Sequence, residues 1–170
     1  MKLNLACGLN AFPDFTNVDK VDLPGVDMVY DLEQFPWPFE DNSVEEVFCS
    51  HYIEHVPEII KFMDEIWRVC KDGAIVKFVA PYYTHYGAYA DPTHCRVICD
   101  STFLYYSKKW REQPSIRLGY YPIKSDFDVL DVGWNFEKEW DKRSDETKLF
   151  ALHHYWNVVH EIRITLKANK

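Results

Sequence analysis

The chain has 170 residues, 47% of them hydrophobic and 16% aromatic, enough to bury the core of one domain spanning residues 1–170. Its formal net charge of −8 argues against a nucleic-acid partner, because nucleic-acid binders usually carry a basic patch. No apolar run approaches the roughly 20 residues of a membrane helix, and no signal-peptide pattern opens the sequence. Five cysteines without paired spacing indicate a reducing compartment, so we predict a cytoplasmic protein with no membrane partner.

The first part of the chain predicts short strands joined by tight turns. Apolar or alternating runs predict strands at 3–7, 15–18, 26–30 and 44–49. Only ten residues separate Gly8 from Asp19, which is too few for a crossover helix. The connection from Asp19 to Val26 is shorter still, so we expect loops at both places.

The rest of the chain alternates helix and strand patterns. Apolar residues at helical spacing predict a helix from Pro57 to Lys71, which Asp72-Gly73 would end. The remaining expected elements are a strand at 74–80, a loop at 82–99, a helix from Asp100 or Ser101 to Trp110, a strand at 126–136, a helix from Ser144 or Asp145 to Val158, and a strand at 161–168.

This order predicts an α/β protein with a Rossmann-like sheet, mostly parallel with an antiparallel edge strand. Several strands alternate polar and apolar residues, whereas strands covered on both faces read as continuous apolar runs. We therefore expect reduced helices on one face of the sheet. That face is solvated, covered by the segment from Tyr82 to Tyr121, or covered by a second subunit in a homodimer.

The glycine turn and the following carboxylate indicate a nucleoside site. Gly8 follows the first expected strand and allows a ligand to approach the backbone, because it has no Cβ. Asp19 ends the second strand, where its carboxylate can accept hydrogen bonds from ribose hydroxyls. The absence of further glycines and of a helix start after Gly8 argues against a dinucleotide-binding oxidoreductase.

Ordered segments along nearly the whole chain resemble the class I S-adenosylmethionine (SAM)-dependent methyltransferases, of the small methyltransferase-11-like type. The matching segments are Leu3-Asn4-Leu5-Ala6-Cys7-Gly8, Asn17-Val18-Asp19, Asp31-Leu32, Phe35 to Phe39, Ser50 to His55, Glu65 to Gly73, Asp91-Pro92-Thr93-His94 and Asn157 to Ile162. The resemblance implies SAM as the cofactor. It also implies that SAM contacts Ala6, Cys7, Gly8, Asp19, Lys20, Asp31, Leu32 and Ser50.

Three histidines are candidates for a general base, which is needed only if the acceptor must lose a proton. His51, His85 and His94 are placed by pattern near the carboxyl ends of strands, although a surface or structural hydrogen-bonding role is the more common one for each. Tyr82, Tyr83, His85 and His94 are candidates for substrate contact. The tyrosines can equally serve to cover the sheet.

One motif suggests a different chemistry. His51, Glu54 and His55 match the H-x-x-E-H signature of inverted zinc peptidases, which requires both histidines on one face of a helix. Here the motif falls in a strand-to-helix turn, so a zinc-dependent hydrolase is disfavoured and no metal ion is predicted.

The predicted function is SAM-dependent methyl transfer to an unidentified small-molecule or polar acceptor. The alternative is a SAM-binding module without methyl-transfer activity. Asn4, Ala6 and Asn10 favour that alternative, because the usual first motif of the family carries an acid and glycines at these positions.

Overall fold

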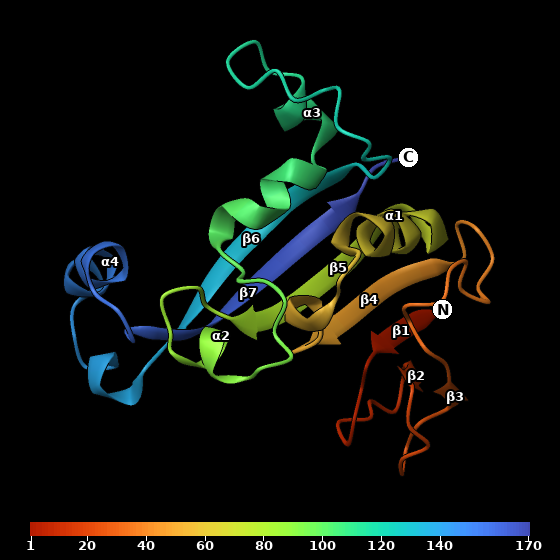
Figure 1. The fold of residues 1–170 in the computed structure, drawn as a ribbon, viewed down its shortest axis with the longest axis horizontal. Helices are drawn as coiled ribbons and strands as arrows, with labels where there is room; N and C mark the ends of the chain where they lie inside the picture. Colours follow the sequence, from red (N-terminus) through yellow and green to blue (C-terminus); the bar gives the residue numbers. More distant parts are fainter.

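The computed structural model describes residues 1–170 and contains one seven-stranded sheet in the order β3-β2-β1-β4-β5-β7-β6 (Figure 1). The strands are β1 Lys2–Leu5, β2 Thr16–Asp19, β3 Met28–Val29, β4 Val44–Ser50, β5 Cys70–Pro81, β6 Phe127–Phe136 and β7 Val159–Ala168. The first five strands are parallel, and β7 is antiparallel to both of its neighbours, β5 and β6. The predicted, mostly parallel α/β sheet with an antiparallel addition at one edge is confirmed.

The helices are few and mostly short. They are α1 Ile59–Val69, α2 Gly87–Ala90, α3 Lys108–Arg111 and α4 Asp145–His154, together with 3₁₀ helices at Ile53–His55, Asp100–Tyr106 and Lys138–Trp140. None of these helices combines the length and the apolar character that a membrane crossing requires.

Two expected helix ends are wrong. Asp72-Gly73 does not end α1 but lies inside β5, where Cys70 pairs with Val44 and the register then shifts. Gly73 has φ +77°, a conformation that suits glycine in such an irregularity. The helix expected up to Trp110 is divided at Ser107, whose extended backbone separates the 3₁₀ helix Asp100–Tyr106 from α3.

One face of the sheet holds the hydrophobic core. Val76, Phe78 and Ala80 alternate along β5 and are buried on this face. Phe103, from the 3₁₀ helix Asp100–Tyr106, stacks on Phe78 with ring centroids 5.2 Å apart. Figure 1 shows α1 and this 3₁₀ helix on the same side of the sheet. The segment from Tyr82 to Tyr121 therefore contributes to the face that α1 already covers.

The opposite face is largely polar and lacks a helical layer. Glu46 binds Lys77 at 2.8 Å and Lys2 at 2.9 Å, which joins β5, β4 and β1 across this face. Arg163 of β7 continues it and is exposed. The expected reduction of helices on one face is confirmed. Of the three alternatives for that face, cover by residues 82–121 is not what the structure shows, because Phe103 of that segment packs on the other face. The charged side chains fit the solvated alternative, and the homodimer stays a prediction.

A buried asparagine closes the short connection between β1 and β2. The amide nitrogen of Asn17 donates to the carbonyls of Phe12 and Phe15 at 3.0 and 3.2 Å and to Asp27 at 2.8 Å. Its amide oxygen accepts from the Asn4 side chain at 2.9 Å and from the Phe12 backbone at 2.8 Å. These bonds satisfy loop groups that a crossover helix would otherwise satisfy internally.

Replacing Asn17 by alanine is expected to lower the free energy of unfolding by about 2–4 kcal/mol, because it leaves buried donors and acceptors without partners. Urea denaturation followed by circular dichroism measures this loss. Asn10→Ala, in the same loop, is the control and is expected to change stability by about 0.5 kcal/mol or less, because its side chain is exposed. Equal stability of the two variants would contradict the role assigned to Asn17.

Candidate active site

A cavity of about 420 Å³ opens at the carboxyl ends of the parallel strands, where ligands bind in open α/β sheets. Its wall comes from the turns after β1, β2, β3 and β4 and from the loop after α2. The lining residues are Ala6, Asp19, Lys20, Tyr30, Asp31, Leu32, Glu33, His51, Tyr52, His55 and Thr93. Carboxylates outnumber lysines in this wall, so the local field favours a ligand with positive charge.

Two backbone amides, one to each carboxylate oxygen, orient the side chain of Asp19. The Gly8 amide donates to its Oδ2 at 2.9 Å, and the Val21 amide donates to its Oδ1 at 3.0 Å. Each carboxylate oxygen can accept a further hydrogen bond, so the group remains able to bind two hydroxyls. Gly8 has φ +53°, and a Cβ placed on it would meet nothing within 4 Å. No protein atom fills that space, which leaves it open to a ligand.

Residues 30 to 33 form one part of the cavity wall, and hydrogen bonds through Trp37 connect this part to helix α1. The Leu32 carbonyl accepts from the Trp37 indole at 3.0 Å, and the Trp37 amide donates to Glu65 at 2.6 Å. Asp31 lies at the cavity, and its Oδ1 accepts from the Glu33 amide at 3.0 Å. The wall is thus connected through Trp37 to a side chain of α1.

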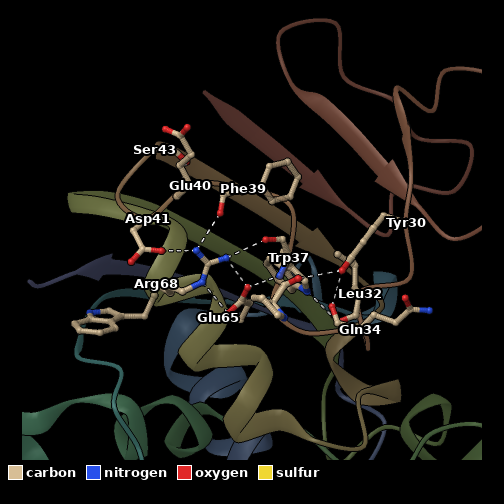
Figure 2. A network of polar contacts seen from close by, with 12 residues as sticks. Tyr30, Leu32, Gln34, Trp37, Phe39, Glu40, Asp41, Ser43, Glu65 and Arg68 are labelled. Carbon is tan, nitrogen blue, oxygen red and sulfur yellow. Dashed lines mark hydrogen bonds and ion pairs between the residues drawn. The ribbon is translucent and has the colours of Figure 1, made fainter.

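Arg68 completes this connection (Figure 2). Its guanidinium donates to both oxygens of Glu65, to the carboxylate of Asp41, and to the carbonyls of Trp37 and Phe39 at 3.1 and 3.0 Å. The hydrogen bonds to Glu65 raise the pKa of Arg68 above its already high value. A fixed, permanently charged fork of donors therefore holds the long connection between β3 and β4 in place of a helix.

His51 lies in the cavity wall between two carboxylates. Its Nε2 is 2.9 Å from Glu161 Oε1, and its Nδ1 is 3.5 Å from Glu54 Oε1. Glu54 and then Glu161 raise the pKa of His51, while burial opposes them. Asn135 donates to Glu161 at 2.8 Å and, together with His51, lowers the pKa of this carboxyl despite its burial. His51 is therefore biased toward its cationic form, which is a poor general base.

The other catalytic and substrate candidates, Tyr82, Tyr83, His85 and His94, do not line the cavity. His85 does not line the cavity: its Nδ1 accepts from the Gly87 amide and its Nε2 pairs with Glu137 at 3.1 Å. Tyr82 is 2% exposed, and burial raises the pKa of its phenol. Tyr83 is more exposed but also lies outside the lining.

Among the predicted cofactor contacts, those in the wall are Ala6, Asp19, Lys20, Asp31 and Leu32. Cys7, Gly8 and Ser50 lie beside it in sequence without lining it. The roles of all these residues in binding remain proposals.

Five lining residues were not predicted to have any role in the site: Tyr30, Glu33, Tyr52, His55 and Thr93. Each is one to four residues from a predicted site residue, so only its position after a strand end, and not its residue type, could have identified it. The 3₁₀ helix Ile53–His55 turns the chain back at once, which brings His55 to the cavity together with His51.

The strand-to-helix turn also shows whether His51, Glu54 and His55 have the geometry of the zinc-peptidase motif. His51 precedes the 3₁₀ helix and has φ +51°, so His51 and His55 do not share one face of an α-helix. The expected mismatch with that motif is confirmed. A different set, Glu54, His55 and His94, places one ligand atom of each residue within 4.8 Å of the others.

Comparison with known proteins agrees with this geometry. Residues 5–78 match the family model described as "Methyltransferase domain". No curated protein matches the chain. The structure of a SAM-dependent methyltransferase from Archaeoglobus fulgidus aligns with a TM-score of 0.66 at 19% identity, covering 98% of this chain and 85% of the other.

Two further solved structures have the same fold. A protein assigned as a methyltransferase from Bacillus halodurans aligns with a TM-score of 0.60 at 19% identity over 99% of this chain and 92% of the other. The cyclase SpnF aligns with a TM-score of 0.59 at 15% identity over 99% of this chain and 75% of the other. The fold is that of the class I SAM-dependent methyltransferases, and the predicted resemblance is confirmed. The family match over residues 5–78 and this fold are consistent with the predicted SAM cofactor and with methyl transfer as the general activity.

Proposed function

We propose that this chain transfers the methyl group of SAM to a small, polar acceptor. The single observation that carries the proposal is the backbone-anchored carboxylate of Asp19 in the cavity at the strand ends. A phosphate-free nucleoside suits this site, because the short turn after Gly8 offers no helix N-terminus for a pyrophosphate.

The cavity residues suit the parts of this cofactor. Asp19 would accept hydrogen bonds from the ribose hydroxyls, and Asp31 with the Leu32 backbone would meet the polar edge of adenine. Lys20 would flank the base, and the backbone at Ala6 to Gly8 would approach the methionine part. When bound, SAM supplies a methyl group on a sulfonium, which a nucleophilic acceptor can take up. The acidic wall favours such a cation.

The chain would act mainly by positioning, which can contribute about 7–11 kcal/mol in well-oriented reactions. His51 and His55 belong to the wall after β4, where they would border the acceptor. His51 is held by Glu161 and faces Glu54, so its first role would be to orient and to supply charge. His85 is paired with Glu137 outside the cavity and is not proposed as a base.

The second candidate is a SAM-binding module without methyl-transfer activity. Asn4 stands where the family usually has an acid, and its amide donates to the Asn10 carbonyl and to Asn17. The residue is thus used to close the loop. The fold also occurs in a cyclase, so the fold alone does not identify the reaction.

Isothermal titration of the purified chain with S-adenosylhomocysteine tests the proposal. One binding site per chain is expected, and the absence of binding would refute the proposed function. A methyl-donor assay with a panel of small acceptors then separates the two candidates. Turnover with any acceptor excludes the module without transfer activity, whereas binding without turnover across the panel favours it.

A further inference from the structure

A glutamate and two histidines from separate segments meet beside the cavity. Glu54 and His55 belong to the 3₁₀ helix after β4, and His94 comes from the loop after α2. One ligand atom of each lies within 4.8 Å of the others, and the rings of His55 and His94 are 4.7 Å apart. Two imidazoles and a carboxylate form a common ligand set for divalent transition-metal ions.

Hydrogen bonds to backbone carbonyls join the two segments. The Cys95 amide donates to the Glu54 carbonyl at 3.0 Å, and the Arg96 guanidinium donates to the Val56 carbonyl at 3.0 Å. These hydrogen bonds hold the segment that carries Glu54 and His55 against the segment that carries His94. Ligands around an ion with bonds of about 2.0–2.2 Å are separated by roughly 3–4 Å. The cluster needs only a small closure to reach that separation.

The hydrogen bonds of both histidines leave the same nitrogen free. Thr93 Oγ1 donates to Asp91 at 2.6 Å, so at 2.9 Å it accepts a hydrogen from His55 Nδ1. The Ala88 carbonyl, which can only accept, is 3.1 Å from His94 Nδ1. In both rings Nδ1 carries the hydrogen and Nε2 keeps a lone pair. Metal-binding histidines are oriented by partners of this kind.

The burial of Glu54 is a second observation in favour of a bound cation, independent of the distances within the cluster. Its residue is 2% exposed, yet neither carboxylate oxygen has a hydrogen-bond partner. Its nearest cationic group is His51 Nδ1 at 3.5 Å, a loose ion pair. A buried carboxylate without hydrogen bonds is costly, and buried charges are normally paired or bound to a metal. A cation between Glu54 and the two histidines would remove this cost.

We propose that Glu54, His55 and His94 bind a divalent first-row transition-metal ion at the wall of the cavity. Two imidazole nitrogens favour zinc, iron or cobalt over magnesium, which prefers oxygen ligands. This site differs from the H-x-x-E-H motif, because His94 takes the place of His51. It also revises the expectation from the sequence that no metal is bound.

The position of the site indicates a substrate class. His55 and its partner Thr93 line the cavity, so coordination positions not filled by protein would face the acceptor. Such an ion would hold an acceptor through oxygen, for example a hydroxyl, phenol or carboxylate. This second part rests on the proposed methyl transfer, whereas the binding of the ion does not.

Metal titration of the tag-free protein, first dialysed against a chelator, tests the binding site without SAM. Zinc is followed by calorimetry and cobalt by its visible absorption. The wild type is expected to bind one ion per chain. Glu54→Gln and His94→Gln are each expected to weaken binding about 100-fold, and Thr93→Val about 10-fold, because it only orients His55.

His153→Gln is the control, because this histidine is exposed on α4, away from the cluster. It is expected to bind zinc as the wild type does, and circular dichroism checks that each variant is folded. Absence of one-to-one binding by the wild type, or equal affinity of folded Glu54→Gln, His94→Gln and wild type, would overturn the site. S-adenosylhomocysteine binding is measured separately, so a failed metal site and a failed proposed function give different results.

Discussion

Asp19→Asn is expected to weaken the binding of S-adenosylhomocysteine by about 100-fold or more. The carboxylate would accept hydrogen bonds from both ribose hydroxyls, and hydrogen bonds to a charged group contribute about 1.5–3 kcal/mol each. The amide keeps one acceptor and presents a donor to the other hydroxyl, so at least about 2.8 kcal/mol of binding energy is lost. Calorimetric titration of wild type and variant measures the ratio of the two dissociation constants.

The matched control is Asp14→Asn, which removes the same charge from an exposed position in the preceding loop. Its affinity is expected to stay within about twofold of the wild type, because exposed charges in salt solution interact weakly with distant groups. Asp19 also orients the Gly8 and Val21 amides, so thermal melting verifies that the variant is folded. A folded Asp19→Asn protein with unchanged affinity would show that Asp19 does not hold the ribose.

Glu65→Ala is expected to reduce the free energy of unfolding by about 3–5 kcal/mol, a large part of the stability of an ordinary domain. Glu65 is 8% exposed, and its loss leaves the Trp37 amide without its acceptor and Arg68 without its main partner. Glu65 is the buried member of this ion pair, whereas the Arg68 side chain is 26% exposed, so removing Glu65 leaves a partly buried charge with the exposed Asp41 as its remaining anionic partner. Urea denaturation measures the effect. The dependence of the free energy of unfolding on urea concentration is expected to keep the slope of the wild type.

Two variants test whether this loss comes from the network. The double variant Glu65→Ala/Arg68→Ala is expected to lose less stability than the sum of the two single variants, because the side chains are coupled. Lys61→Ala breaks the exposed pair with Glu58 on the same helix and is expected to cost about 0.5 kcal/mol or less. Additive single effects, or an equal loss in Lys61→Ala, would contradict the buried network.

The network also connects stability to the cavity. Trp37 binds both Glu65 and the carbonyl of Leu32, which is a lining residue. A loosened connection between β3 and β4 would allow the wall to move. Glu65→Ala is therefore expected to weaken nucleoside binding as well, although its side chain does not line the cavity.

Local pattern was sufficient for most of the sheet. Alternation along 161–168 and the turn residues Asp41-Asn42-Ser43 before 44–49 are local properties of the sequence, and both strands form close to the expected places. The boundary at Asp72-Gly73 could not be found in this way, because a glycine with positive φ serves a helix end and a strand irregularity equally well. The pairing of Cys70 with Val44, a long-range contact, decides between them.

The candidate site shows the same division. Asp19, Asp31 and His51 were predicted because each directly follows a strand, and parallel strands bring their ends together. His85 was predicted because of its position after a strand, but it forms an ion pair with Glu137, a residue from a distant segment. Thr93 and the Glu54, His55 and His94 cluster depend on how the loop after α2 folds back on the 3₁₀ helix.

By itself, the sequence determined the order of strands and helices, the shortness of the connections and the acid at the end of β2. These depend on residue spacing, because ten residues cannot hold a crossover helix and a strand end exposes the next side chain. Only the tertiary structure decided which face of the sheet is open, what replaces the missing helices, and which histidines meet a carboxylate. Those features arise from contacts between segments far apart in the chain, such as Arg68 with Asp41 and His55 with His94, which no local pattern encodes.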